Sequence, residues 1–326
     1  MKIKALYILI LLNILCSASG QTGFVCPEDC LKHDTGKKHP EKKERLDAIL
    51  KQLKEKGLFS KLVIIEAAPE PLDKIRAVHP PEYIKEVEES CFEEKSYLHS
   101  KDTIISKDSY LAACMAAAGV TAAVDAVMNR KVKNAFCAVR PPGHHASKNK
   151  AMGFCIFNNV AIGARYVQNA YKLRKVLIVD FDVHHGNGTQ DIFKNDPNVL
   201  YFSIHRSPFY PGTGNAEEKG CGNIVNVPLP KSSGDAEYVK VFEETFRSRA
   251  FEFKPDFIFI SAGFDAHKDD PLGGMNLTAE CYGKMTAIIK EIAEKHNGGR
   301  IVSVLEGGYG PGLADSVYAH ITELMK

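Results

Sequence analysis

Residues 176–188 read VLIVDFDVHHGNG. The run Val176–Val179 is apolar at every position and lacks the alternation of a strand that faces solvent on one side. This pattern indicates a strand buried on both faces, which is typical of a parallel sheet covered by helices. Polar residues begin where the strand ends, and open parallel sheets bind ligands outside the carboxyl ends of their strands. The stretch therefore predicts both the fold class and the position of a functional site.

The same organisation continues along the chain. Six further apolar runs predict strands at 61–65, 135–139, 199–204, 224–227, 256–260 and 301–305. Helical patterns lie between them at 40–57, 109–128, 157–171, 237–251, 278–296 and 313–325. No linker interrupts this order after the first forty residues. We predict one doubly wound α/β domain with a mostly parallel sheet flanked by helices.

Composition excludes several classes of function. The 326 residues include 42 Lys and Arg and 40 Asp and Glu, which gives a formal net charge of +2. A near-neutral chain is not expected to bind nucleic acid directly through phosphate contacts, and its net charge is too small to attract it to an anionic membrane. The charged fraction of 25% and the hydrophobic fraction of 44% are those of a globular protein. The oligomeric state does not follow from these numbers.

The first twenty residues resemble an export signal. Lys2 and Lys4 precede the apolar run 5–16, and Ala18-Ser19-Gly20 supplies the small residues of a cleavage site. The run is too short for a membrane span, which needs about 20 residues. We expect cleavage before Gln21 and a periplasmic or secreted protein; a buried N-terminal helix is the alternative.

Export has a consequence for the cysteines. Nine are present, and Cys16 would leave with the signal. An oxidising compartment permits disulfides, so a local or long-range bridge at Cys26 or Cys30 is an expectation, although the sequence does not determine the pairing. No C-x-x-C pair occurs, so a zinc ribbon is not expected.

Five predicted strands run directly into polar segments. These segments are RPPGHH at 140–145, DFDVHHGNG at 180–188, SIH at 203–205, SAGFDAH at 261–267 and EGGYG at 306–310. Loops that leave the same edge of a parallel sheet converge in space. We therefore expect all five segments to form one site.

The second segment carries half of a metal site. Asp182 and His184 are two residues apart on an extended chain, so they share a face. Asp265, which follows another strand, is the natural third ligand, and three protein ligands leave a coordination position for water and substrate. In isolation, such a motif is equally consistent with a polar capping loop.

The remaining polar residues suit acid–base catalysis. His144 and His145 offer a base for a metal-bound water, although an isolated pair would more often lie on the surface. Asp180 can orient one imidazole and Asn187 the other. Tyr309, in a glycine-rich turn, can donate a hydrogen bond to a developing oxyanion. Its alternative role is packing against the sheet edge.

Taken together, these motifs resemble the zinc-dependent histone deacetylases, most closely the class II and bacterial members. The motifs that carry the resemblance are HDTGKKHPEKKERLDAI at 33–49, RPPGHHA at 140–146, GFCIFNNVAIGA at 153–164, DFDVHHGNGTQDIF at 180–193, YFSIHR at 201–206, YPGTG at 210–214, SAGFDAHKDDPLGG at 261–274 and LEGGY at 305–309. They follow one another over nearly all of residues 26–326. The resemblance implies an arginase–deacetylase fold with about eight strands, and it makes residues 21–326 one catalytic domain.

The resemblance also implies roles for individual residues. Zinc, or alternatively Fe²⁺, would be held by Asp182, His184 and Asp265. His145 resembles the general base and acid, His144 its electrostatic partner backed by Asp180, Asn187 the residue that orients His145, and Tyr309 the transition-state tyrosine. A structural K⁺ would be held, mostly through backbone oxygens, by Asp180, Asp182, His184, Ser203 and Ile204.

Other residues are implied for the substrate. Phe154 and Tyr210 would line an acyl-lysine tunnel, where Tyr210 departs from the more usual Phe. The carbonyl of Gly153 would accept a hydrogen bond from the substrate amide, and Arg45 would line an inner acetate channel. Leu272 stands where family members that prefer acetylpolyamines carry an acidic residue.

The implied reaction is hydrolysis of N-acetyl-lysine, in a peptide or protein, to lysine and acetate. Leu272 favours acetyl-lysine peptides over acetylspermidine. Two alternatives stay open: an acetylpolyamine or other small-molecule amidohydrolase on the same fold, and a non-catalytic secreted binding protein. A dinuclear arginase-like enzyme is more distant, because a second set of ligands is not evident. Export would separate the enzyme from the chromatin of its own cell.

Overall fold

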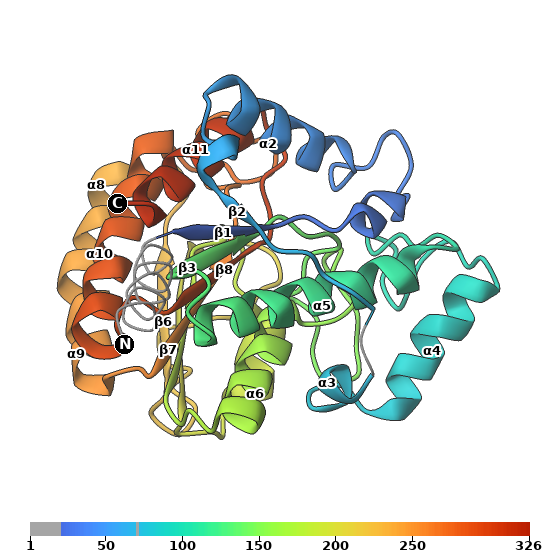
Figure 1. Cartoon of the computed structure of the whole chain (residues 1–326), viewed down its shortest axis with the longest axis horizontal. Helices are drawn as coiled ribbons and strands as arrows, with labels where there is room; N and C mark the ends of the chain where they lie inside the picture. Colours follow the sequence, from blue (N-terminus) through green and yellow to red (C-terminus); the bar gives the residue numbers. More distant parts are fainter. Residues whose placement is uncertain (1–20, 70–71) are drawn as a thin grey trace, which may run out of the picture.

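The computed structural model describes residues 21–326 except 70 and 71 (Figure 1). The predicted export signal at 1–20 lies outside the described residues. One sheet of eight parallel strands, in the order β2-β1-β3-β8-β7-β4-β5-β6, crosses the middle of the domain. The strands are β1 Thr22–Val25, β2 Val63–Ile64, β3 Asn134–Cys137, β4 Val176–Asp180, β5 Val199–Arg206, β6 Ile224–Leu229, β7 Phe257–Ala262 and β8 Ile301–Leu305. The prediction of a parallel α/β sheet is confirmed.

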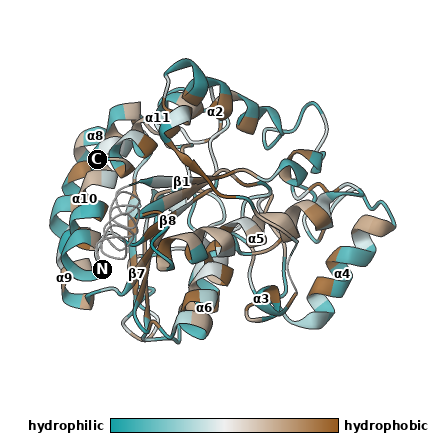
Figure 2. Cartoon of the chain, viewed as in Figure 1, coloured by the Kyte–Doolittle hydropathy of each residue, from teal (hydrophilic) through white to brown (hydrophobic). Residues whose placement is uncertain are grey.

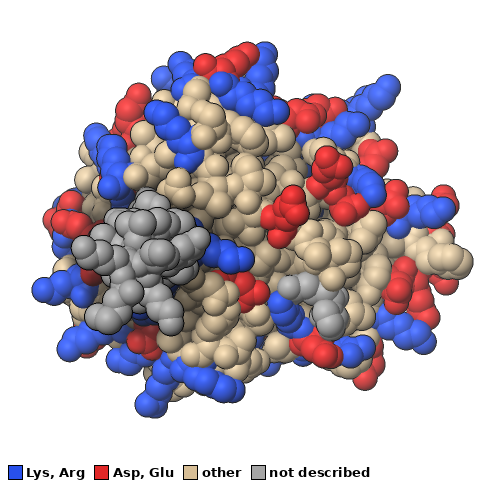
Figure 3. Space-filling model, viewed as in Figure 1, with Lys and Arg blue, Asp and Glu red and all other residues tan. Residues whose placement is uncertain are grey.

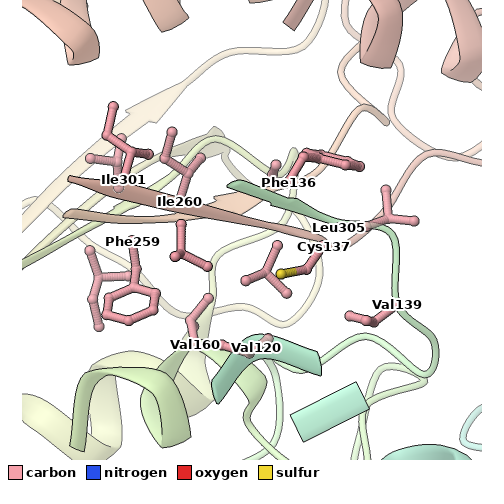
Figure 4. Close-up of a cluster of buried hydrophobic side chains, with 14 of the residues drawn as sticks. Val120, Phe136, Cys137, Val139, Val160, Phe259, Ile260, Ile301 and Leu305 are labelled. Atoms are coloured by element: carbon pink, nitrogen blue, oxygen red, sulfur yellow. The ribbon is translucent and has the colours of Figure 1, made fainter. Parts of the chain in front are cut away.

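Helices cover both faces of the sheet (Figure 1). They are α2 Glu44–Glu55, α3 Asp73–Arg76, α4 Pro81–Phe92, α5 Ser109–Met128, α6 Asn159–Tyr171, α7 Asn187–Phe193, α8 Asp235–Val241, α9 Arg247–Phe253, α10 Ala279–Asn297 and α11 Leu313–Leu324. Helices α5 and α6 pack on one face, and α10 and α11 pack on the other. Figure 4 shows Val120 of α5 and Val160 of α6 directed at Phe259 and Cys137 of the sheet.

Burial explains why the strands lack alternation. Every residue of β4, β7 and β8 is buried, because helices lie above and below these central strands. Figure 2 shows the strands as predominantly hydrophobic, while the outer helices are mixed. Helix α5 is long and apolar enough to cross a membrane, but most of it is buried against β1, β3 and β8, as expected for a core helix.

The structure contains elements that the sequence patterns do not predict. Strand β1 is one of them, because Thr22–Val25 is short and contains a glycine; it forms by pairing with β2 on one side and β3 on the other. Helices α3, α4 and α7 also lie outside the predicted helices. The predicted helix at 237–251 is divided, because a π-helical turn at Phe242–Phe246 separates α8 from α9.

The order of the strands gathers the polar segments. The five strands that run into them, β3, β8, β7, β4 and β5, are consecutive neighbours in the sheet. In register, Asp180 at the end of β4 pairs with Ser261 of β7 and with Ser203 of β5. The five segments therefore leave one continuous stretch of the sheet edge, as predicted.

The surface charge and the cysteine side chains can be compared with the sequence predictions. On the face in Figure 3, acidic and basic side chains are interspersed, in keeping with the near-neutral charge. All eight cysteines of the described residues are free thiols, so the expected bridge at Cys26 or Cys30 is not formed.

Candidate active site

The predicted metal ligands lie together at the end of β4. Asp182, His184 and Asp265 each offer a ligand atom, and these atoms all lie within 4.8 Å of one another. Nδ1 of His184 is 3.0 Å from Oδ1 of Asp182 and 3.1 Å from Oδ2 of Asp265. The other carboxylate oxygens are held by the main chain: Gly307 N–H donates to Oδ2 of Asp182 and Val183 N–H donates to Oδ1 of Asp265.

The donor set fits a metal ion. Oδ2 of Asp265 is buried and makes no hydrogen bond among the described residues, although Nδ1 of His184 lies 3.1 Å from it. A buried carboxylate oxygen is costly unless hydrogen bonds or a cation satisfy it, so this oxygen has capacity left for an ion. Two carboxylates and one imidazole are also the ligand types that zinc accepts in catalytic sites with an open position. The group can therefore hold an ion and leave room for a substrate oxygen.

Burial and nearby charges shift the pKa values of Asp265 and His184. Burial raises the pKa of Asp265 to about 7, and the nearby charge of Asp182 acts in the same direction. Burial opposes charge on His184 as well, but its contacts with Asp182 and Asp265 raise its pKa to about 10. A site that favours positive charge between two carboxylates suits a cation.

His144 lies behind the metal group. Its Nδ1 donates to Oδ2 of Asp180 at 3.0 Å, and Asp180 also accepts from the hydroxyl of Tyr201 at 2.8 Å. Burial disfavours the charged imidazole, yet the carboxylates of Asp182 and Asp180 outweigh it and raise the pKa of His144 well above 6.5. His144 is therefore suited to stay protonated.

His145 has the opposite character. Burial, followed by the charges of His144 and His184, lowers its pKa well below 6.5. Its Nδ1 lies 2.8 Å from Oδ1 of Asn187, the first residue of α7. Because an amide oxygen can only accept, Nδ1 of His145 carries the proton, which leaves Nε2 as the basic nitrogen.

Tyr309 is held by residues that sequence reasoning assigned differently or missed. Its backbone N–H and that of Gly310 donate to Oδ2 of Asp270, a residue expected at the rim of the site but not as a support of this turn. The guanidinium of Arg45 lies 4.8 Å from the centre of the Tyr309 ring and donates to the carbonyl of Gly308 at 2.7 Å. Backbone N–H and carbonyl partners leave no signature in a sequence, so these supports could not be read from it.

A narrow cavity of about 150 Å³ leads to the group. All four predicted substrate residues line it, and so do His144, His145, His184 and Tyr309. The complete lining is Asp102, Pro142, His144, His145, Gly153, Phe154, Cys155, His184, Tyr210, Leu272, Gly307 and Tyr309. The volume is that of about five waters, which leaves room for a small part of a ligand such as a side chain and not for a bulky one.

The rings around the cavity are in edge contact. Tyr210 meets His145 at 5.2 Å between ring centres, and Phe154 meets Tyr309 at 5.7 Å. The Tyr210 hydroxyl, which a Phe would lack, points to Oδ2 of Asp102 at 3.4 Å. Asp102 was not predicted; it places a carboxylate on the cavity wall.

Position 153 requires a glycine. It has a φ of +56°, and a Cβ there would lie 2.3 Å from Cδ2 of His145. Only glycine allows the loop to pass so close to the imidazole.

The chain is similar to proteins of one known family. The family model described as "Histone deacetylase domain" matches residues 39–325. A "Probable deacetylase" of Archaeoglobus fulgidus is 42% identical over 294 residues, which cover 88% of this chain and 81% of that protein. "Histone deacetylase 10, chloroplastic" of Oryza sativa is 39% identical, with coverages of 87% and 68%.

Two further relatives extend the comparison. "Polyamine deacetylase HDAC10" of Mus musculus is 39% identical over 86% of this chain, which spans only 44% of that protein. The solved structure titled "Crystal Structure of HDA15 HD domain" superposes with a TM-score of 0.90 at 39% identity, covering 94% of this chain and 89% of that one. The predicted fold is therefore confirmed, and the chain belongs to the histone deacetylase domain family.

Proposed function

We propose that this chain is a zinc-dependent deacetylase that hydrolyses N-acetyl-lysine to lysine and acetate. The observation that carries the proposal is the group formed by Asp182, His184 and Asp265 at a narrow cavity that also contains His145 and Tyr309. Family membership supports the reaction class. Zinc is favoured by the mixed carboxylate and imidazole donors, and Fe²⁺ accepts the same set. When bound, such an ion polarises the acetyl carbonyl and lowers the pKa of water.

The side chains then divide the proton transfers between them. Nε2 of neutral His145 takes the proton of the attacking water as the new C–O bond forms at the acetyl carbon. The hydroxyl of Tyr309 donates a hydrogen bond to the carbonyl oxygen as negative charge develops on it. Burial, partly offset by Arg45, raises the pKa of Tyr309 well above 10, so the phenol keeps its proton for this role. His145 then gives its proton to the leaving nitrogen as the C–N bond breaks.

Two residues support the base without moving a proton themselves. Asn187 holds the Nδ1–H tautomer of His145, and protonated His144, backed by Asp180, places positive charge beside the developing oxyanion. On the substrate side, the carbonyl of Gly153 accepts from the amide N–H, and Phe154, Tyr210 and Leu272 surround the methylene chain.

A second candidate substrate is an acetylated polyamine. Asp102 on the cavity wall offers a carboxylate to a distal ammonium, and two relatives, of Mus musculus and Rattus norvegicus, are named polyamine deacetylases. Leu272 favours a peptide, because it offers such an ammonium no charge.

The deciding experiment is a paired measurement of kcat/KM on an acetyl-lysine peptide and on acetylspermidine, with the zinc content of the same samples. We expect one zinc per chain and preference for the peptide. Preference for acetylspermidine would support the second candidate. Zinc-loaded protein without turnover on either substrate would favour a non-catalytic binding protein. Asp182→Asn, which alters one ligand, should lose both zinc and turnover.

Two further parts of the proposal concern the chain as a whole. We propose a structural K⁺ held by Asp180, Asp182, His184, Ser203 and Ile204; the pairing of Asp180 with Ser203 across β4 and β5 supports it. Restoration of thermal stability by KCl, but not by LiCl, in dialysed protein would test it.

We also propose that residues 1–20 direct export and that 21–326 is the mature enzyme. Cleavage before Gln21 would spare the sheet, because β1 begins at Thr22. Mass spectrometry of protein recovered after expression in an exporting host would test this; a retained N-terminus in the cytoplasmic fraction alone would contradict it.

A further inference from the structure

A buried carboxyl group lies directly behind the loop that carries the tandem histidines. Glu306 is the first residue after β8, and it is fully buried. Its Oε2 accepts from the backbone N–H of Gly143 at 2.7 Å and from that of His144 at 3.1 Å. The hydroxyl of Ser261 donates to Oε1 at 3.0 Å. None of the proton transfers proposed for the reaction involves this group.

The loop depends on this carboxyl group for its position. Gly143 and His144 lie beyond the end of β3, and a buried N–H that lacks an acceptor is costly. Glu306 supplies the acceptor for both. On its other side the loop is packed tightly, because a Cβ at Gly143 would lie 2.5 Å from the backbone nitrogen of Asn159 in α6. The backbone is therefore held between Glu306 and α6.

Glu306 is itself attached to the rigid centre of the sheet. Its backbone N–H donates to the carbonyl of Ala262 in β7 at 2.9 Å, and its carbonyl accepts from Arg45. Glu306 thus connects the sheet edge, through its backbone, to the histidine loop, through its carboxyl group.

We propose that Glu306 is a positioning residue of the reaction: it fixes the backbone from which His144 and His145 project, and so places Nε2 of His145 against the substrate carbonyl. The inference rests on the proposed function, because it concerns the base of that reaction. Displacement of a catalytic group by about 1 Å can cost 10²-fold in rate. A glutamine at this position keeps one oxygen for the two N–H groups and an amide N–H for Ser261, whereas an aspartate is one methylene too short to reach.

The test compares Glu306→Gln with Glu306→Asp in zinc-loaded protein. We expect the Gln variant to retain kcat within about threefold of wild type and the Asp variant to lose about 10–100-fold. KM should stay within about twofold for both, because the change acts on the histidine loop and not on Phe154, Tyr210 or Leu272, which line the cavity on the substrate side. Ser261→Ala is the matched control: it removes only the third hydrogen bond, so kcat should stay within about threefold.

A second readout does not depend on activity. Imidazole ¹⁵N resonances of His144 and His145, measured by NMR, should move in the Asp variant and stay in place in the Gln variant. Unchanged resonances together with wild-type kcat in the Asp variant would overturn the proposal, and so would a Gln variant as slow as the Asp variant. If the wild type had no turnover at all, the proposed function would fail, while the resonances would still decide the role of Glu306.

Discussion

Replacement of Gly307 by alanine should destroy the candidate metal site while the fold persists. A Cβ at this position would lie 2.3 Å from Oδ2 of Asp265 and 2.6 Å from Oδ2 of Asp182. Real Cβ contacts are essentially never closer than 3.0 Å, so the Asp265 oxygen would have to move by about 0.7 Å or more. Ligand distances in metal sites vary by only about 0.2 Å, so both carboxylates would leave ligating positions. The backbone itself tolerates alanine, because Gly307 has no positive φ.

We expect zinc affinity to fall by about 10–100-fold and turnover to fall with occupancy. Zinc content after dialysis against a buffered zinc concentration, the deacetylation rate and circular dichroism measure the three quantities. Gly283→Ala is the matched control. Gly283 lies within α10, and a Cβ there would meet nothing closer than the carbonyl oxygen of Ala319 in α11, at 3.7 Å. That variant should keep zinc and gain about 0.5–1 kcal/mol of stability. A Gly307→Ala protein with full zinc and full turnover would refute the placement of the metal between these carboxylates.

The other predictions concern catalysis, specificity and stability. Tyr309→Phe should lower kcat by about 10²–10³ with zinc content and KM little changed, because Asp270 and Arg45 hold the turn without the hydroxyl; an unchanged kcat with a raised KM would assign Tyr309 to binding alone. Leu272→Glu should shift the kcat/KM ratio toward acetylspermidine by about 10–100-fold in a paired assay, through a partly desolvated charge pair; an unchanged ratio would contradict this. Burial lowers the pKa of His320 to about 3, so between about pH 6.5 and that value only the unfolded chain takes up this proton, and the free energy of unfolding should fall as pH falls, by about 1.4 kcal/mol per pH unit. Urea unfolding of metal-free protein at pH 6.5, 5.5 and 4.5 should therefore show a shallower pH dependence for His320→Gln than for wild type, and equal slopes would contradict it.

Local patterns in the sequence predicted the fold class and most of the site. Strands β4, β7 and β8 are buried on both faces, and such burial requires continuous apolar runs, which are visible without a structure. The pair Asp182 and His184 was readable for a similar reason: alternate residues of an extended chain share a face whatever surrounds them.

What the sequence left open depends on contacts between distant segments. Thr22–Val25 is a strand only because β2 and β3 pair with it, and four residues with a glycine have no strand pattern of their own. The strand order determines that β7 lies beside β4, and this neighbour relation brings Asp265 to the other two ligands.

The supports of the catalytic side chains were also decided by the tertiary structure alone. Asp270 and Glu306 accept from backbone N–H groups, and Arg45 donates to backbone carbonyls. Every residue type except proline offers the same N–H and carbonyl groups, so no pattern of side chains marks the partner. Residue identity and spacing thus indicated which side chains can carry the chemistry. The packing of the sheet edge decided which groups hold them in place, because a main-chain hydrogen bond depends on position and not on residue identity.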